Sequence, residues 1–184
     1  MNAIQHVRVK VFARQPAPID QGEAIAVFHR WIQDHACPEM LIDVADYRHV
    51  PDGPGVMLIG HEANYSLDNT KGRLGLLYSR KQEGGGAQEN LRQAFDAAVA
   101  ACRRLEQEPA FAGKLAFDSG ECEFSINDRL LAPNREETYI ALKPEFERFF
   151  TATWGQGAYA MEQKGEPREL FCIRVWNKLG QPAL

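Results

Sequence analysis

The densest group of chemically useful side chains is the run Gly-His-Glu-Ala-Asn-Tyr, which directly follows four apolar residues. We interpret residues 56–65 as one strand, whose alternation places His61 and Tyr65 on one face of a sheet. Glu62 and Asn64 then lie on the other face. An imidazole or a carboxylate here could act as a general base, and pockets tend to combine apolar walls with a few polar groups. This end of the strand is therefore the first candidate for a site.

A second source of carboxylates is the strand expected just before it, at residues 41–48. A tight hairpin would bring Asp43 close to Glu62, and a carboxylate pair in a pocket raises one pKa and supplies both an acid and a base. The alternative is that these are solvated residues at a sheet end, where Asp46 pairs with Arg48. The sequence leaves both interpretations open.

Metal binding would need ligands that converge from several strands. The side chains that could contribute are Asp43, His49, His61 and Glu62. Their spacing matches no ligand motif, so we predict no metal site, and we assign no cofactor. The four cysteines lie far apart and form no Cys-x-x-Cys pair, and the N-terminus has no signal-like apolar run. We therefore expect a reduced, cytoplasmic protein.

Two stretches of the chain, residues 6–65 and 121–176, form a weak pseudo-repeat. Each begins with a strand-like run, continues with Arg-x-x-Ala-Pro, and then has a predicted helix cap with a Glu three residues later. The predicted caps are Asp20 and Asn134. If a pseudo-twofold axis related the two halves, Arg14 and Arg129 would face one groove and clamp a carboxylate or phosphate. Alternatively, each arginine bonds the carbonyl groups of its own turn.

Hydrophobic periodicity predicts the elements that would carry these groups. The predicted helices run from residue 20 to about 35, from 87 to about 106, and from 135 onward, the last one stopping or kinking near Leu142 because Pro144 follows. The predicted strands are 7–12, 41–48, 56–65, 73–80, 122–126, 158–163 and 170–176. Residues 56–59 are apolar on both faces, which favours a central strand.

This order predicts an α+β fold, in which about three helices pack on one face of a mostly antiparallel sheet. We expect a single domain over residues 1–184, since only the glycine triplet at 84–86 resembles a boundary. The sequence leaves open whether that triplet is a lid or a connector. A net charge of −4 argues against nucleic acid as a partner, and no apolar run is long enough to span a membrane.

We predict a small-molecule-binding domain with a pocket between the helices and the polar end of the hairpin. Besides the acid–base candidates His61, Glu62 and Asp43, the predicted ligand-binding residues are Asp46, Arg48, Asn64, Tyr65, Arg14 and Arg129. One alternative is a non-catalytic homo-oligomeric module, such as a homodimer, that pairs through a sheet edge or an aromatic patch. That patch would be Phe146, Phe149, Phe150 and Trp154. A further alternative is a small, metal-independent acid–base enzyme.

Overall fold

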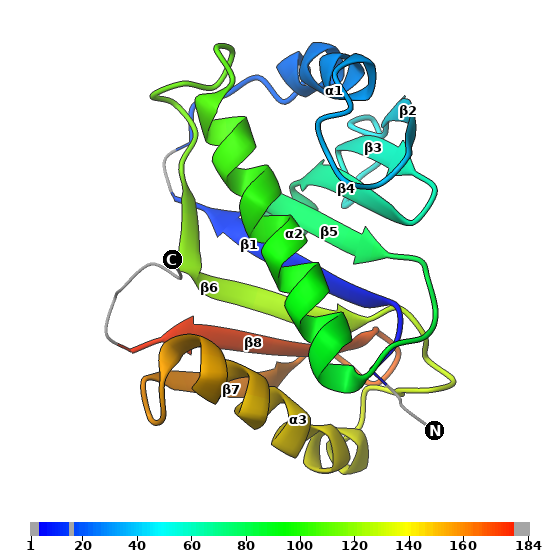
Figure 1. The fold of residues 1–184 in the computed structure, drawn as a ribbon, viewed down its shortest axis with the longest axis vertical. Coiled ribbons are helices and arrows are strands. Elements are labelled where there is room, and N and C mark those ends of the chain that lie inside the picture. The colour runs from blue at the N-terminus through cyan, green and yellow to red at the C-terminus, as the bar shows by residue number, and fades with distance from the viewer. Residues whose placement is uncertain (1–3, 15–16, 179–184) are drawn as a thin grey trace.

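The computed structural model describes residues 4–14 and 17–178 (Figure 1). The elements, in chain order, are β1 (Val7–Ala13), α1 (Glu23–Gln33), β2 (Leu41–Asp46), β3 (Val56–Gly60), β4 (Ala63–Asp68), the 3-10 turn η1 (Thr70–Gly72), β5 (Gly75–Arg80), α2 (Ala87–Gln107), β6 (Phe117–Ile126), α3 (Glu136–Trp154), β7 (Tyr159–Lys164) and β8 (Phe171–Asn177). In this described part of the chain, eight strands form one sheet in the order β2-β3-β4-β5-β1-β6-β8-β7, and every neighbouring pair is antiparallel.

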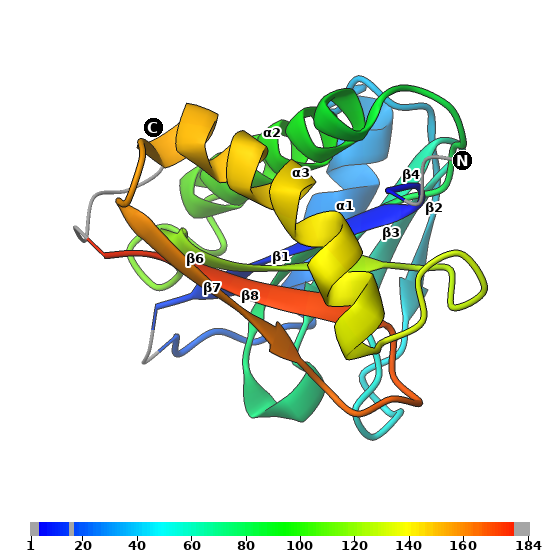
Figure 2. The same cartoon turned by 90° about the horizontal axis from the view of Figure 1, so that it is seen from below.

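The three helices lie on one face of this sheet, which confirms the predicted α+β architecture (Figure 2). The strand pattern explains which face they cover. Val9 and Val11 of β1 are fully buried, and Phe124 of the neighbouring strand β6 stacks on Phe95 of α2 with 6.0 Å between ring centroids. The residues that alternate with these must point to the opposite face.

Aromatic side chains of α3 fill one half of the core. Phe146, Phe149 and Phe150 are each 1% exposed or less, and all three rings pack edge-on against Phe124 of β6. Trp154 stacks on Phe150. Three of the four aromatic residues proposed as an interface patch are therefore buried within the chain, and Trp154 is partly buried beside them.

The predicted stop of the third helix near Leu142 is wrong, since α3 continues through Pro144. Pro144 is exposed, and so is Ile140 one turn before it, with 62% of its surface accessible. The carbonyl group that loses its helical donor to a proline four residues later is thus on the hydrated side of the helix. Solvent exposure of this carbonyl lowers the cost that we expected to end the helix.

The single strand predicted at residues 56–65 is also wrong, because β3 and β4 are separate strands of a hairpin with His61 and Glu62 at its turn. Gly60 permits this turn: a Cβ there would lie 2.6 Å from the Ala63 carbonyl oxygen. Nor is β3 central, since only β2 separates it from the sheet edge.

Neither predicted helix cap begins its helix. Asp20 accepts the N–H of Gly22 at 2.8 Å, in a turn that precedes α1. Asn134 is 3% exposed, and its amide donates to the carbonyl oxygens of Lys164 at the end of β7 and Glu166 in the β7–β8 connection. Both side chains hold loops in place instead.

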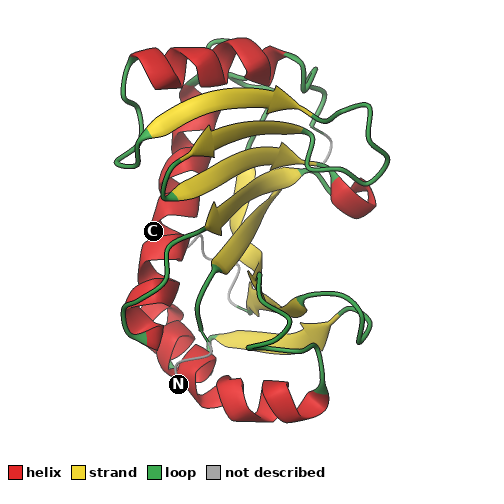
Figure 3. Ribbon diagram, turned by 90° about the vertical axis from the view of Figure 1, so that its right-hand side faces the viewer, coloured by secondary structure: helices red, strands yellow, loops and turns green. Residues whose placement is uncertain are grey.

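The two halves of the chain nevertheless follow one route. Each starts with a central strand, β1 or β6, passes through a helix, continues as an edge strand, β2 or β7, and then returns toward the centre. The sheet curves so that the three α-helices lie along its outer side, and the opposite side forms a concave face next to the short turn η1 (Figure 3).

Candidate functional site

The acid–base candidates lie at the β3–β4 turn, on the surface. The side chain of His61 is 65% exposed and stands 3.4 Å from the Glu62 carboxylate. The Glu62 carboxylate accepts the N–H of Met40 at 3.0 Å. This hydrogen bond, together with one from the backbone N–H of Glu62 itself, lowers the pKa of the carboxyl group. Asp43 lies opposite Ile59 rather than Glu62, and it accepts the N–H of Val44 at 2.8 Å. The two carboxylates serve different backbone groups and do not form the acid–base pair that we considered.

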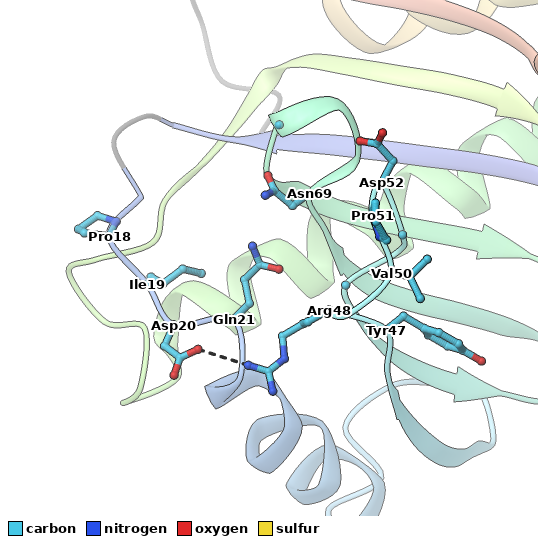
Figure 4. A pocket seen from close by; sticks show the side chains of 13 residues that line it. Pro18, Ile19, Asp20, Gln21, Tyr47, Arg48, Val50, Pro51, Asp52 and Asn69 are labelled. Carbon is cyan, nitrogen blue, oxygen red and sulfur yellow. Dashed lines mark ion pairs between the residues drawn. The ribbon is translucent and has the colours of Figure 1, made fainter.

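Asp46 and Arg48 pair with each other, as in the structural alternative. Arg48 donates to both carboxylate oxygens, from Nε at 2.9 Å and from a terminal nitrogen at 2.8 Å. These hydrogen bonds lower the pKa of Asp46 to about 2. Arg48 lines a cavity of about 700 Å³, where it also reaches Asp20 at 3.6 Å (Figure 4). The charge of Arg48 is thus balanced by the protein itself.

Tyr65 faces the helices at a second cavity, of about 460 Å³, between α2 and the connection that follows α1. Its hydroxyl donates to Glu39 at 2.6 Å, and the same carboxylate accepts the hydroxyl of Tyr78 at 3.2 Å. Gln93 donates to Tyr78 and accepts from Arg80. This cavity lies between the helices and the hairpin, and the hydroxyl of Tyr65, a predicted residue that lines it, is already engaged by Glu39.

The other predicted residues do not converge on a site. Asn64 accepts the N–H of Gly60 at 3.4 Å, within its own hairpin. Arg14 follows the end of β1 near Phe117, whereas Arg129 follows the opposite end of the antiparallel partner β6. Arg129 donates to the carbonyl of Arg168 at 3.2 Å. The two arginines therefore lie at opposite ends of the central strand pair and cannot share one groove.

A third cavity, of about 430 Å³, lies on the concave face, where none of the predicted site residues is found. Alternate residues of β1 line it, and the register extends the lining sideways across the sheet. Arg8 is opposite Ser79 on one side and Ser125 on the other, while Lys10 is opposite Leu77 and Glu123. The further strand β8 contributes Cys172 beside Ser125 and Arg174 beside Glu123.

Lys10 is buried on this face because it has a partner. Only 7% of the residue is exposed, and its ammonium group bonds to Asp68, which is 3% exposed. Asp68 also accepts the hydroxyl of Thr70 at 2.7 Å. Gly75 lies between the two strands that carry the pair, and a Cβ on it would stand 3.0 Å from the Lys10 side chain. Because Gly75 has no side chain, the Lys10 side chain has room to extend across β5 to Asp68.

Most other cations of this cavity are fixed in the same way. The guanidinium of Arg73 lies 3.6 Å from the ring centroid of Phe12 and donates to Glu121 at 2.8 Å. Arg174 donates to the same carboxylate at 2.9 Å. Burial alone would raise the pKa of Glu121, but the two guanidinium groups outweigh it and lower that pKa.

An ion pair also bridges the mouth of the cavity. Lys71 of η1 donates to Glu169 of the β7–β8 connection at 2.8 Å, across 98 residues of sequence. The hydrogen bond raises the pKa of Lys71 and lowers that of Glu169. The two loops are thereby joined above the sheet.

Arg8 is the exception among these cations. Its Nε is buried without a hydrogen-bond partner, and the described residues place no carboxylate within ion-pair distance of its guanidinium. Burial lowers the pKa of Arg8, while the charge of Asp68 acts against this from a distance. An arginine stays protonated under such conditions. Within the described part of the chain, the concave cavity therefore contains a positive charge that no carboxylate contacts directly.

Within residues 4–14 and 17–178, no three His, Cys, Asp or Glu side chains are grouped so that they could hold a metal ion. The same residues contain no helix that is long and apolar enough to cross a membrane. No model of a known protein family matches the chain, and no curated protein matches its sequence. The proposed function therefore rests on the geometry of the cavities.

Proposed function

We propose that the protein binds a small molecule through an anionic group, and that Arg8 on the concave face holds that group. The observation that carries this proposal is the unpaired guanidinium. A buried donor without a partner costs about 1–3 kcal/mol, and more when it is charged. A carboxylate or phosphate ligand offsets that cost, because it accepts two parallel hydrogen bonds from a guanidinium.

The surroundings favour the same class of ligand. Six basic and three acidic residues line the cavity, in a chain whose net charge is −4. Such a local excess attracts anions and raises their rate of association. The volume of about 430 Å³ falls within the usual range for small-molecule pockets. Because the other basic side chains are fixed by partners, they shape the cavity without having to reorganise.

The alternative of a self-associating module has less support. Its aromatic patch is internal, and the edge strand β2 is irregular, since its register shifts between Leu41 and Asp43. The side chain of Asp43 also accepts a hydrogen bond from the N–H of Val44. A bulge and acidic side chains are devices that discourage a further strand from pairing with an edge. An acid–base enzyme at the β3–β4 turn lacks the raised carboxyl pKa that it would need.

Thermal unfolding with a panel of acetate, inorganic phosphate and larger carboxylates and phosphates tests the proposal, at constant ionic strength. A ligand present at about 100 times its Kd stabilises the native state by about 2.7 kcal/mol. We expect at least one anion to raise the Tm of the wild type and of Arg148→Gln, a control on α3 whose side chain is 66% exposed. The rise should vanish in Arg8→Gln. A rise that persists in Arg8→Gln, or no rise with any anion, would refute the proposal.

A further inference from the structure

The concave cavity contains a second unpaired charge, of the opposite sign. Glu123 is half-buried and lines the cavity, yet among the residues that the structure describes it has no hydrogen bond or ion pair. Its neighbours in register are already engaged, Lys10 with Asp68 and Arg174 with Glu121. Glu123 acts on the surrounding cations only through space. The cavity thus presents one unpaired anion beside one unpaired cation.

The register places these two charges close together on the same face. Arg8 lies directly opposite Ser125, and Glu123 lies two residues from Ser125 along β6. Diagonal neighbours of this kind on adjacent antiparallel strands are about 7–8 Å apart. The two side chains nevertheless do not come within ion-pair distance of each other. A ligand with two opposite charges close together could contact both.

Part of the wall near these charges is apolar. Leu77, opposite Lys10 on β5, is 8% exposed, and Leu170 lines the cavity from the β7–β8 connection. A ligand that is charged at one end and apolar at the other would match this division. In an α-amino acid, the carboxylate, the ammonium group and the side chain are all attached to one carbon atom.

We infer that the ligand is a free α-amino acid with an apolar side chain. Its carboxylate accepts hydrogen bonds from Arg8, its ammonium group donates to Glu123, and its side chain lies against Leu77. This inference rests on the proposed function, since it uses the same arginine, and it adds the zwitterionic nature of the ligand. Glu123 would also repel a dianion such as a phosphate monoester, so the inference favours carboxylate ligands within the broader class of anions.

Isothermal titration calorimetry with three compounds of one carbon skeleton tests the inference. L-leucine has both charges, isocaproate lacks the amino group, and isoamylamine lacks the carboxylate. L-phenylalanine and its two matching analogues form a second series. We expect the wild type to bind at least one of the two amino acids at least about tenfold more tightly than either of its analogues, because each analogue loses charge-assisted hydrogen bonds.

Variants separate the roles of the two charges. Glu123→Gln should weaken amino-acid binding at least about tenfold while isocaproate binds as before or more tightly, since a repulsive charge is gone. Arg8→Gln should abolish binding of both. The control Glu147→Gln, on α3 with a side chain 48% exposed, should bind like the wild type.

Two results would overturn the inference in different ways. If carboxylates without an amino group bind as tightly as amino acids and still need Arg8, the zwitterion is wrong but the proposed anion site stands. If neither amino acids nor any anion of the earlier panel binds, both fail.

Discussion

Two cations of β1 that point to the same face should have opposite effects on stability. Lys10 is paired with the buried carboxylate of Asp68, whereas Arg8, two residues away, has a buried Nε without a partner. Methionine is unbranched and apolar, so it can replace either side chain without a new polar group. We expect Lys10→Met to destabilise the ligand-free protein and Arg8→Met to stabilise it.

The magnitudes follow from the surroundings of each charge. Removing one partner of a buried ion pair costs about 3–5 kcal/mol, because the other charge stays buried. For a chain of this size, Lys10→Met should thus lower the Tm by roughly 6–20 °C. An unpaired buried donor costs about 1–3 kcal/mol, and we take the lower end since Arg8 is only half-buried. Arg8→Met should then raise the Tm by roughly 2–4 °C.

Urea unfolding followed by circular dichroism measures both variants, with Arg148→Met as the exposed control. The slope of free energy against urea should be unchanged, which would show that the unfolded state is the same. A loss of more than about 1 kcal/mol in Arg8→Met would refute the reasoning, because the guanidinium would then contribute to the fold. A Lys10→Met variant as stable as the wild type would refute the buried pair.

Three further predictions concern the framework of the concave face. Gly75→Ala should destabilise by about 1–3 kcal/mol in urea unfolding, since its Cβ would meet a β1 carbonyl oxygen at 2.6 Å. Glu121→Gln should be less stable than the wild type at neutral pH. Because the native pKa of Glu121 is lowered from 4.5, this difference in stability should shrink as the pH falls below 4.5. A difference that stays constant with pH would contradict the prediction. Lys71→Met should change stability by less than about 1 kcal/mol, since the ion pair with Glu169 is largely exposed, yet it should speed ligand dissociation in stopped-flow measurements.

The framework was predictable from the sequence wherever one face of an element is buried. Alternation in β1 and the apolar stripe of α2 located both elements, because burial of one face imposes a period on the residues. The errors arose where close contacts decide the structure. Gly60 ends β3 because only a residue without Cβ fits against the Ala63 carbonyl, and Pro144 is tolerated because its side of α3 is hydrated. Neither the close approach at Gly60 nor the hydration at Pro144 can be predicted from the neighbouring residues in the sequence.

The candidate site on the concave face was not among the predictions because its residues are far apart in the sequence. The expectation relied on residues 60–65, which are adjacent in the chain and therefore conspicuous. The concave cavity instead joins β1, β4, β5, β6 and β8, and its buried pair spans 58 residues. One signal was present: Phe12 occupies the face of β1 that Arg8 and Lys10 made look solvated. An apolar ring at that position indicates that the polar face is covered.

The concave cavity differs from the cavity of Figure 4 in whether its cations are paired. In the cavity of Figure 4, Arg48 is held by Asp46 and Asp20. Such charges need no ligand. Arg8 and Glu123 line a cavity that has room for a ligand. Within the described residues, neither charge has a partner. Because hydrogen-bond satisfaction is a property of the folded arrangement, this distinction appears only in the structure.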